Sequence, residues 1–393
     1  MNIQQLSRLR DDTPGCAGRI HLNNAGAALP PRAVVQAMHD YLDLEAQIGG
    51  YEAADWRAED IAGFYSSVAQ MLQTSARNIA FAGSATDAYA RALSAVPLRE
   101  GEVVLTTEND YVSNQIAFLS LQKRLGIRVV RAADTPEGGV DVADLERLLK
   151  KHRPALVAVT HVPTNSGLVQ PVEAVGRLCR AEGVWYLVDA CQSAGQMPLD
   201  VTRIGCDFLA ATFRKFLRGP RGAGFLYVSD RALDAGLDLL LPDMRGADWT
   251  APDEYVAQPD ARRYEYWEMS PALLLGSKAA VEYALEQGLD AIQERVVRLA
   301  ATTRTMLADL PGVRVLDRGA SLCGIVTAWR PDWQPQALLQ HLAAQRINGR
   351  ITTIGSAQLD FSRKGVGWAL RISPHYYNTE AEIAALGEAL SLL

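Results

Sequence analysis

Short apolar strands alternate with helices along most of the chain, and this alternation constrains the fold more than any other feature. Strands are expected at residues 79–82, 103–106, 127–131, 155–160, 184–188, 208–212 and 224–228. Helices are expected at residues 31–47, 54–73, 85–96, 112–125, 142–151 and 172–182. Strands that alternate with helices predict an α/β domain with a largely parallel sheet. Uninterrupted apolar strands such as 184–188 indicate that helices cover both faces of that sheet.

The C-terminal part of the chain has a different pattern. A long helix is expected to begin near residue 273, and shorter elements follow it at 313–315, 324–328, 336–345 and 369–373, with a last helix after Asn378. A chain of 393 residues is too long for one ordinary core. We therefore expect a large domain over residues 20–290 and a smaller α+β domain built from residues 1–19 and 291–393.

Composition disfavours several classes of protein. The net charge of −6 lacks the basic excess of a nucleic-acid-binding protein. No apolar run is long enough to span a bilayer, and the first ten residues lack the apolar stretch of a signal peptide. The five cysteines include no Cys-x-x-Cys pair, so we expect neither a disulfide framework nor a metal site. We expect a cytoplasmic protein without nucleic-acid, membrane or metal partners.

One candidate site residue ends an apolar strand. Residues 184–188 are followed directly by Asp189. In open parallel sheets, ligands bind beyond the carboxyl ends of the strands. A carboxylate at that position could keep a cationic ring nitrogen protonated. Taken alone, Asp189 is better explained as a helix N-cap or a surface ion pair.

The second candidate is a lysine between a short strand and a glycine-rich turn. Lys215 is one of only six lysines, and Phe213 and Phe216 flank it. Burial among apolar residues lowers the pKa of a lysine and favours the neutral amine that forms imines. Arg214 and Arg218 are expected to bring positive charge to a phosphate-bearing ligand. A solvated basic loop is the alternative.

The two segments together carry a family resemblance. Asp189 to Gln192, followed by residues 211–224 with their Gly-Pro-x-Gly-x-Gly run, resembles the class V aminotransferase family of fold-type I pyridoxal-phosphate (PLP) enzymes. That family includes cysteine desulfurases and isopenicillin N epimerase-like proteins. The resemblance extends from His21 to Thr379. It implies a mainly parallel seven-stranded sheet, pyridoxal 5'-phosphate as cofactor, an amino acid substrate, and a homodimer with active sites at its interface.

The resemblance also implies roles for the residues around the lysine. Lys215 matches the Schiff-base lysine, and Asp189 matches the partner of the pyridine nitrogen. Gln192 matches the residue that contacts the phenolic oxygen of the cofactor, and Thr212 matches a hydroxyl that binds its phosphate. Arg214 stands where the family usually has histidine.

Two earlier segments match the phosphate loop and the ring-stacking segment of the family. The backbone N–H groups of Ala85 and Thr86, which open a helix, would hold the phosphate as helix N-termini hold anions. A plain capping motif is the alternative for that segment alone. Tyr111 stands where desulfurases have a histidine, and it can stack on the cofactor ring.

The substrate end of the site is expected at three places in the sequence. Thr164 aligns with an asparagine of the family, but Asn165 lies next to it, and either could face the cofactor. Arg371 matches the arginine that grips the substrate α-carboxylate, and a guanidinium fork suits that role. Asn23 lies in a segment that resembles the border of the substrate pocket.

The type of reaction is open at this stage. Transamination is the first expectation, with a cysteine-independent C–S β-lyase or an epimerase as alternatives and a non-catalytic PLP-binding protein as a remote one. Desulfurases carry a nucleophilic cysteine in the small domain, but residues 350–358 contain none. Because persulfide formation needs a thiolate there, desulfurase chemistry by that route is not expected. Aromatic residues at 264–268 are expected at a subunit interface.

Overall fold

Seven strands form the central sheet of the computed structural model, which describes residues 1–393. Across the sheet their order is β2 (Ile79–Ala82), β8 (Gly224–Val228), β7 (Phe208–Thr212), β6 (Trp185–Asp189), β5 (Leu156–Thr160), β3 (Val103–Thr107) and β4 (Arg128–Ala132). Only β8 runs antiparallel to its neighbours. The carboxyl ends of the other six strands therefore lie at one edge, as the prediction of a mainly parallel seven-stranded α/β sheet required.

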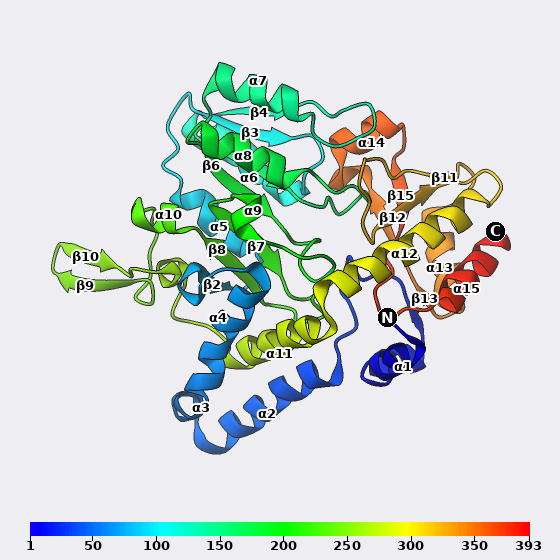
Figure 1. The fold of residues 1–393 in the computed structure, drawn as a ribbon, viewed down its shortest axis with the longest axis horizontal. Coiled ribbons are helices and arrows are strands. Elements are labelled where there is room, and N and C mark those ends of the chain that lie inside the picture. Colours follow the sequence, from blue (N-terminus) through cyan, green and yellow to red (C-terminus); the bar gives the residue numbers. More distant parts are fainter.

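Helices cover both faces of this sheet (Figure 1). Along β5, Val157 and Val159 point into one apolar core, whereas Leu156 and Ala158 point into the other. The first core is closed by α4 (Ala58–Leu72), α7 (Val142–His152), α8 (Val172–Ala181) and α11 (Pro271–Gln287). The second is closed by α5 (Ala85–Ala95), α6 (Val112–Leu125) and α10 (Asp230–Asp234). Burial on both faces explains why these strands are apolar throughout.

A second, four-stranded antiparallel sheet lies in the C-terminal part of the chain. Its order is β11 (Arg314–Val315), β12 (Val326–Trp329), β15 (Trp368–Ile372) and β14 (Arg350–Thr353). One face packs on α12 (Leu289–Ala308), α13 (Pro335–Ala344) and α15 (Glu380–Ser391). Helix α12 begins two residues after α11 ends, and Gly288 joins them with a φ of 78°. The expected domain boundary near residue 290 lies beside this joint and stays a prediction.

The N-terminal segment lies against the C-terminal part of the chain. Strand β1 (Ile20–His21) pairs in parallel with β13 (Ile347–Asn348). Helix α1 (Ile3–Asp11) is fixed by Arg10, which donates to the Tyr377 carbonyl oxygen at 3.0 Å and forms an ion pair with Glu382 at 2.9 Å. Figure 1 shows both chain ends on this side of the molecule.

Several elements differ from the sequence expectation. The helix expected over residues 54–73 is divided at Arg57 into α3 (Gly50–Trp56) and α4, and α2 (Arg32–Ile48) precedes them. Four further helices, α1, α9 (Val201–Ile204), α10 and α14 (Gln358–Lys364), were not expected. None of the helices combines the length and the apolar character needed to cross a bilayer.

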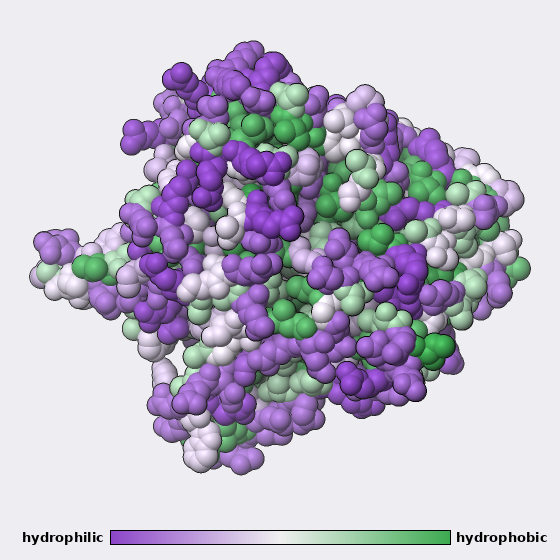
Figure 2. Space-filling model, viewed as in Figure 1, coloured by the Kyte–Doolittle hydropathy of each residue, from purple (hydrophilic) through white to green (hydrophobic).

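A β-hairpin that was also not expected projects from the large sheet (Figure 1). It consists of β9 (Ala247–Ala251) and β10 (Glu254–Ala257). Because most of its side chains are exposed, the segment lacks the alternation that marks a half-buried strand. Figure 2 shows apolar side chains among hydrophilic ones on this projection.

Candidate active site

The carboxyl edge of the large sheet brings together residues at or just beyond the ends of five strands. Ala85 follows β2, Asp110 follows β3 and His161 follows β5, while Asp189 ends β6 and Lys215 follows β7. All five residues are buried. This is the edge at which open parallel sheets bind their ligands.

Lys215 is buried three residues after β7, with only 6% of its surface exposed. No carboxylate lies within ion-pair distance of its ammonium group. Burial lowers the pKa of Lys215, although the nearby charge of Asp189 acts in the opposite direction. Its Nζ lies 5.8 Å from the centre of the Tyr111 ring. The pocket therefore raises the fraction of Lys215 present as the neutral amine, the form that reacts with an aldehyde.

Asp189 is buried and held in one orientation by donors on both carboxylate oxygens. Oδ1 accepts from the Cys191 backbone N–H at 2.9 Å, and Oδ2 accepts from Asn114 Nδ2 at 3.1 Å. Asn114 also donates to Asp110 at 3.1 Å and to Thr160 at 3.3 Å. Sequence reasoning did not single out Asn114. Its signal was its place in the first turn of α6, which begins two residues after Asp110.

The N-terminus of α5 forms an anion-binding turn. The Ser84 side chain caps the helix by accepting from the Asp87 N–H at 3.1 Å. The N–H groups of Ala85 and Thr86 lie in the first turn, where no intrahelical acceptor exists. Gly224 lies directly against this turn, since a Cβ there would come within 2.6 Å of the Ser84 carbonyl carbon and 2.8 Å of the Ala85 nitrogen.

Replacing Gly224 with alanine should distort this turn. The added methyl group would overlap backbone atoms that cannot move aside, and overpacking of this kind costs about 1–3 kcal/mol. We expect a lower melting temperature of the apoprotein and a rise of roughly tenfold in the dissociation constant of pyridoxal phosphate, measured from its absorbance. The matched control is Gly367→Ala, because nothing lies within 4 Å of a Cβ at that position. Unchanged cofactor affinity in Gly224→Ala would show that the α5 turn does not contribute to cofactor binding.

Thr212 and Arg214, which lie close to Lys215 in the sequence, occupy different environments. Thr212 is buried and pairs with Gly224 across the sheet, and its hydroxyl donates to the Ala223 carbonyl oxygen at 3.2 Å. Its oxygen remains an acceptor near the α5 turn. Arg214 is half-buried and donates to the Gly26 carbonyl oxygen. Burial lowers the pKa of Arg214.

The expectation that Arg218 brings charge to a phosphate is wrong. Its side chain is almost fully buried among aromatic rings, with its guanidinium carbon 4.5 Å from the centre of the Tyr377 ring. Arg218 donates to the Leu29 carbonyl oxygen at 2.9 Å and to the Tyr376 hydroxyl at 2.8 Å. A left-handed backbone, with φ at 61°, places the residue in this buried setting. Arg218 therefore joins the N-terminal segment to the C-terminal one.

Arg371 comes from the small sheet and has no acidic partner. Nη1 donates to Thr164 Oγ1 at 2.8 Å and to the Thr164 carbonyl oxygen at 3.1 Å, and Nη2 donates to Asn23 Oδ1 at 3.2 Å. Burial, together with the charges of Arg350 and Arg214, lowers the pKa of Arg371 to about 10. A buried guanidinium held only by neutral acceptors is suited to a carboxylate ligand.

The structure also places the two candidates at 164 and 165. Thr164 Oγ1 accepts from Gln192 Nε2 at 2.7 Å, so Thr164 links Gln192 to Arg371. Asn165 is buried, and its Oδ1 has no hydrogen-bond partner. Gln192 Oε1, His161 Nδ1 and Arg371 Nε are likewise buried without partners. Because buried polar atoms are nearly always satisfied, these atoms, together with Lys215 and the α5 turn, fit a polar, phosphate-bearing ligand such as pyridoxal phosphate.

No reactive thiolate lies at this site. Residues 350–358, which contain no cysteine, form β14 and the turn that follows it. Cys191 is half-buried beside Asp189, and burial raises the pKa of its thiol well above the ordinary value. Burial also raises the pKa of Cys323 to about 12. Both groups are thiols at neutral pH, which makes them poor nucleophiles.

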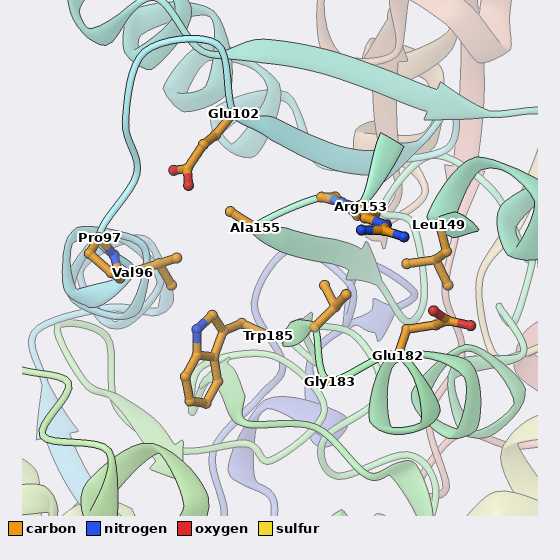
Figure 3. Close-up of a pocket in the computed structure, with 11 residues that line it drawn as sticks. Val96, Pro97, Glu102, Leu149, Arg153, Ala155, Glu182, Gly183 and Trp185 are labelled. Atoms are coloured by element: carbon orange, nitrogen blue, oxygen red, sulfur yellow. The ribbon is translucent and has the colours of Figure 1, made fainter. Parts of the chain in front are cut away.

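A separate cavity of about 540 Å³ lies at the opposite edge of the large sheet (Figure 3). Its lining includes Glu102, which precedes β3, Ala155, which precedes β5, and Trp185, which begins β6. Since these positions mark the amino ends of parallel strands, the cavity lies across the sheet from Lys215.

Comparisons with known proteins agree with this geometry. The model of the family described as Aminotransferase class-V matches residues 20–386. A probable cysteine desulfurase of Methanothermobacter thermautotrophicus is 28% identical, with 99% of this chain and 98% of the relative covered. A probable hercynylcysteine sulfoxide lyase of Mycobacterium tuberculosis is 29% identical, with 98% of this chain and 92% of the relative covered.

Solved structures share the fold. The apo structure of a cysteine desulfurase from Thermococcus onnurineus has a TM-score of 0.91 at 24% identity, covering 100% of this chain and 98% of the other. The cystine C–S lyase C-DES, in complex with its product cysteine persulfide, has a TM-score of 0.86 at 23% identity, covering 96% and 99%. The match of the family model over nearly the whole length confirms the expected cofactor and enzyme class. The chain belongs to the class V aminotransferase family of pyridoxal-phosphate enzymes.

Proposed function

We propose that the protein is a C–S lyase that acts on a cysteine derivative whose sulfur departs as a stable anion. The observation that carries this proposal is a single buried lysine base beside an arginine carboxylate anchor, with no thiolate in the site. Similarity to a probable hercynylcysteine sulfoxide lyase supports it. Transamination, the first expectation, stays an alternative that the assay of pyruvate and ammonia separates, and epimerisation stays a further alternative.

The proposed roles of the residues follow from their positions. Ala85, Thr86 and Thr212 would hold the phosphate of the cofactor, Asp189 its ring nitrogen and Gln192 its phenolic oxygen, while Tyr111 would stack on its ring. When bound, pyridoxal phosphate supplies an electron sink for a carbanion at the substrate Cα.

In the proposed reaction, Arg371 binds the substrate α-carboxylate, and Lys215 removes the proton from Cα. The bond between Cβ and sulfur then breaks, and its electron pair leaves with sulfur. Addition of water to the three-carbon remainder gives pyruvate and ammonia. Thr164 and Asn23 position the Arg371 guanidinium for this task.

The neighbouring acids limit which sulfur groups can leave. Burial lowers the pKa of His161 to about 4, so this side chain is neutral and a poor proton donor. Burial also lowers the pKa of His375 and raises that of Cys191. Apart from Lys215 itself, none of these groups can readily protonate a basic thiolate. We therefore infer a substrate with a weakly basic leaving group, such as a cysteine sulfoxide or a disulfide.

The test compares a sulfoxide with its thioether in the absence of a keto acid. We expect the holoenzyme to release pyruvate and ammonia in equal amounts from S-methyl-L-cysteine sulfoxide, on the order of 10² times faster than from S-methyl-L-cysteine. Pyruvate is measured with lactate dehydrogenase and ammonia with glutamate dehydrogenase. Amino-group transfer that requires a keto acid would contradict the proposal and favour transamination. A holoenzyme that turns over neither compound nor L-cystine would also contradict it.

The homodimer expected from the sequence is part of this proposal. Large apolar side chains are exposed on the hairpin and on the segment before it, at Trp249, Tyr255, Leu240, Leu241 and Met244. Exposed apolar patches of this kind mark protein interaction sites. The expected cytoplasmic location stays a prediction.

A further inference from the structure

We propose that Arg350 forms a second anion-binding subsite beside Arg371, so that the substrate carries an acidic group in addition to its α-carboxylate. The inference deepens the proposed function and rests on it, because it takes Arg371 as the α-carboxylate anchor. It assigns the acidic group to the sulfur substituent of the cysteine derivative.

The strand register places the two arginines side by side. In the antiparallel pair β14–β15, Arg350 lies directly opposite Arg371, and Ile351 lies opposite Leu370. Residues directly opposite one another point to the same face of a sheet, about 4.5–5.5 Å apart at Cβ. Leu370 belongs to the core under α12 and α15. Arg350 therefore projects with Arg371 on the opposite, active-site face.

This pairing of like charges is not compensated within the protein. Like charges directly opposite on a sheet destabilise it. The other strand neighbour of Arg371 is Thr327, whose hydroxyl donates to Asp317, and Asp317 forms its ion pair with Arg304. Neither Arg350 nor Arg371 has a carboxylate within ion-pair distance. An arrangement that destabilises the sheet, such as two like charges without a carboxylate partner, is expected mainly at functional sites.

Position and charge together define the ligand. One carboxylate occupies one guanidinium fork, and Arg371 provides a buried fork for the α-carboxylate. Arg350 is exposed, so it lies nearer the solvent than Arg371. The part of a bound cysteine derivative that points outward from Cα is its sulfur substituent. In the lyase reaction the acidic group departs with the sulfur and its electron pair, so Arg350 selects the substrate without touching the bond that breaks.

The test uses two ligands that differ in one group. S-carboxymethyl-L-cysteine and S-carbamoylmethyl-L-cysteine have nearly the same shape, but only the first carries an acid on the sulfur substituent. Dissociation constants come from titration of the cofactor absorbance of the holoenzyme, with isothermal titration calorimetry as a second readout. We expect the acid to bind about threefold to fivefold more tightly than the amide, because an ion pair at an exposed guanidinium is worth little.

Variants assign the preference to Arg350. The exposed position makes Arg350→Gln compatible with folding, and this variant should reduce the ratio of the two constants to about one. Arg350→Lys should retain part of the preference. Arg177→Gln is the control, because Arg177 is an exposed arginine on α8, away from the site, and its loss should leave the ratio unchanged.

The outcomes separate this inference from the lyase proposal. Equal affinities in the unmodified protein, or no binding of either ligand by calorimetry, would overturn the subsite. A preference that persists in Arg350→Gln would overturn it as well, because Arg350 would then be a solvated surface residue. If the preference depends on Arg350 but the sulfoxides of both ligands yield no pyruvate, the subsite stands and the lyase function fails.

Discussion

Lys215→Ala should abolish the visible absorbance band of the holoenzyme and lower pyruvate formation by at least about 10³-fold. The substitution removes both the amine that is expected to bind the cofactor and the base that is expected to move the Cα proton. General acid–base catalysis alone contributes about 10²–10⁴-fold. The measurement is an absorbance spectrum after addition of pyridoxal phosphate, followed by single-turnover rates with the sulfoxide substrate.

The control for this variant is Lys123→Ala, because Lys123 is exposed on α6 and makes no ion pair. That variant should keep both the absorbance band and the rate. Near-normal turnover in Lys215→Ala, with a visible band that borohydride reduction still abolishes, would mean that another amine forms the imine and carries the chemistry.

Asp189→Asn should have the second largest effect, a loss of turnover between roughly 30-fold and several thousand-fold. Asparagine keeps the shape of the side chain and an oxygen for the Cys191 N–H, but it removes the charge that would hold the ring nitrogen protonated. Removing one partner of a buried, hydrogen-bonded charge pair costs about 2–5 kcal/mol. The rate is measured with saturating substrate and cofactor, so that weaker cofactor binding does not contribute.

The matched control is Asp332→Asn, since Asp332 is exposed and pairs with Arg330 on the surface. Circular dichroism verifies that both variants fold. A turnover within threefold of the unmodified protein in Asp189→Asn would exclude Asp189 as the partner of the ring nitrogen.

The large sheet could be predicted from the sequence because its strands are buried on both faces. Strands such as 184–188 and 208–212 are continuous apolar runs, and their ends place Asp189 and Lys215 at the same edge. The projecting hairpin could not be predicted, because its exposed side chains leave no apolar alternation. The end of a buried strand can be recognised from neighbouring residues in the sequence, because the apolar run stops there. A segment that buries few side chains has no apolar pattern by which it could be recognised.

The roles of individual arginines could be predicted only in part. Arg214 and Arg218 look alike in the sequence, but Arg218 turns to Tyr376 and Tyr377, more than 150 residues away along the chain. The contact of Thr164 with Arg371 likewise joins residues that lie 207 positions apart along the chain. Contacts over such separations are set by tertiary packing, and no local pattern reports them.

The two halves of the candidate site belong to different sheets. Lys215 and Asp189 stand at the edge of the large sheet, whereas Arg371 stands on β15 of the small sheet. A substrate that contacts both sets of residues would hold the two sheets in one relative arrangement. A ligand present at one hundred times its dissociation constant adds about 2.7 kcal/mol to the stability of the state that it binds. Binding energy gained at both sheets therefore stabilises the arrangement in which the carboxylate anchor and the base are in place together.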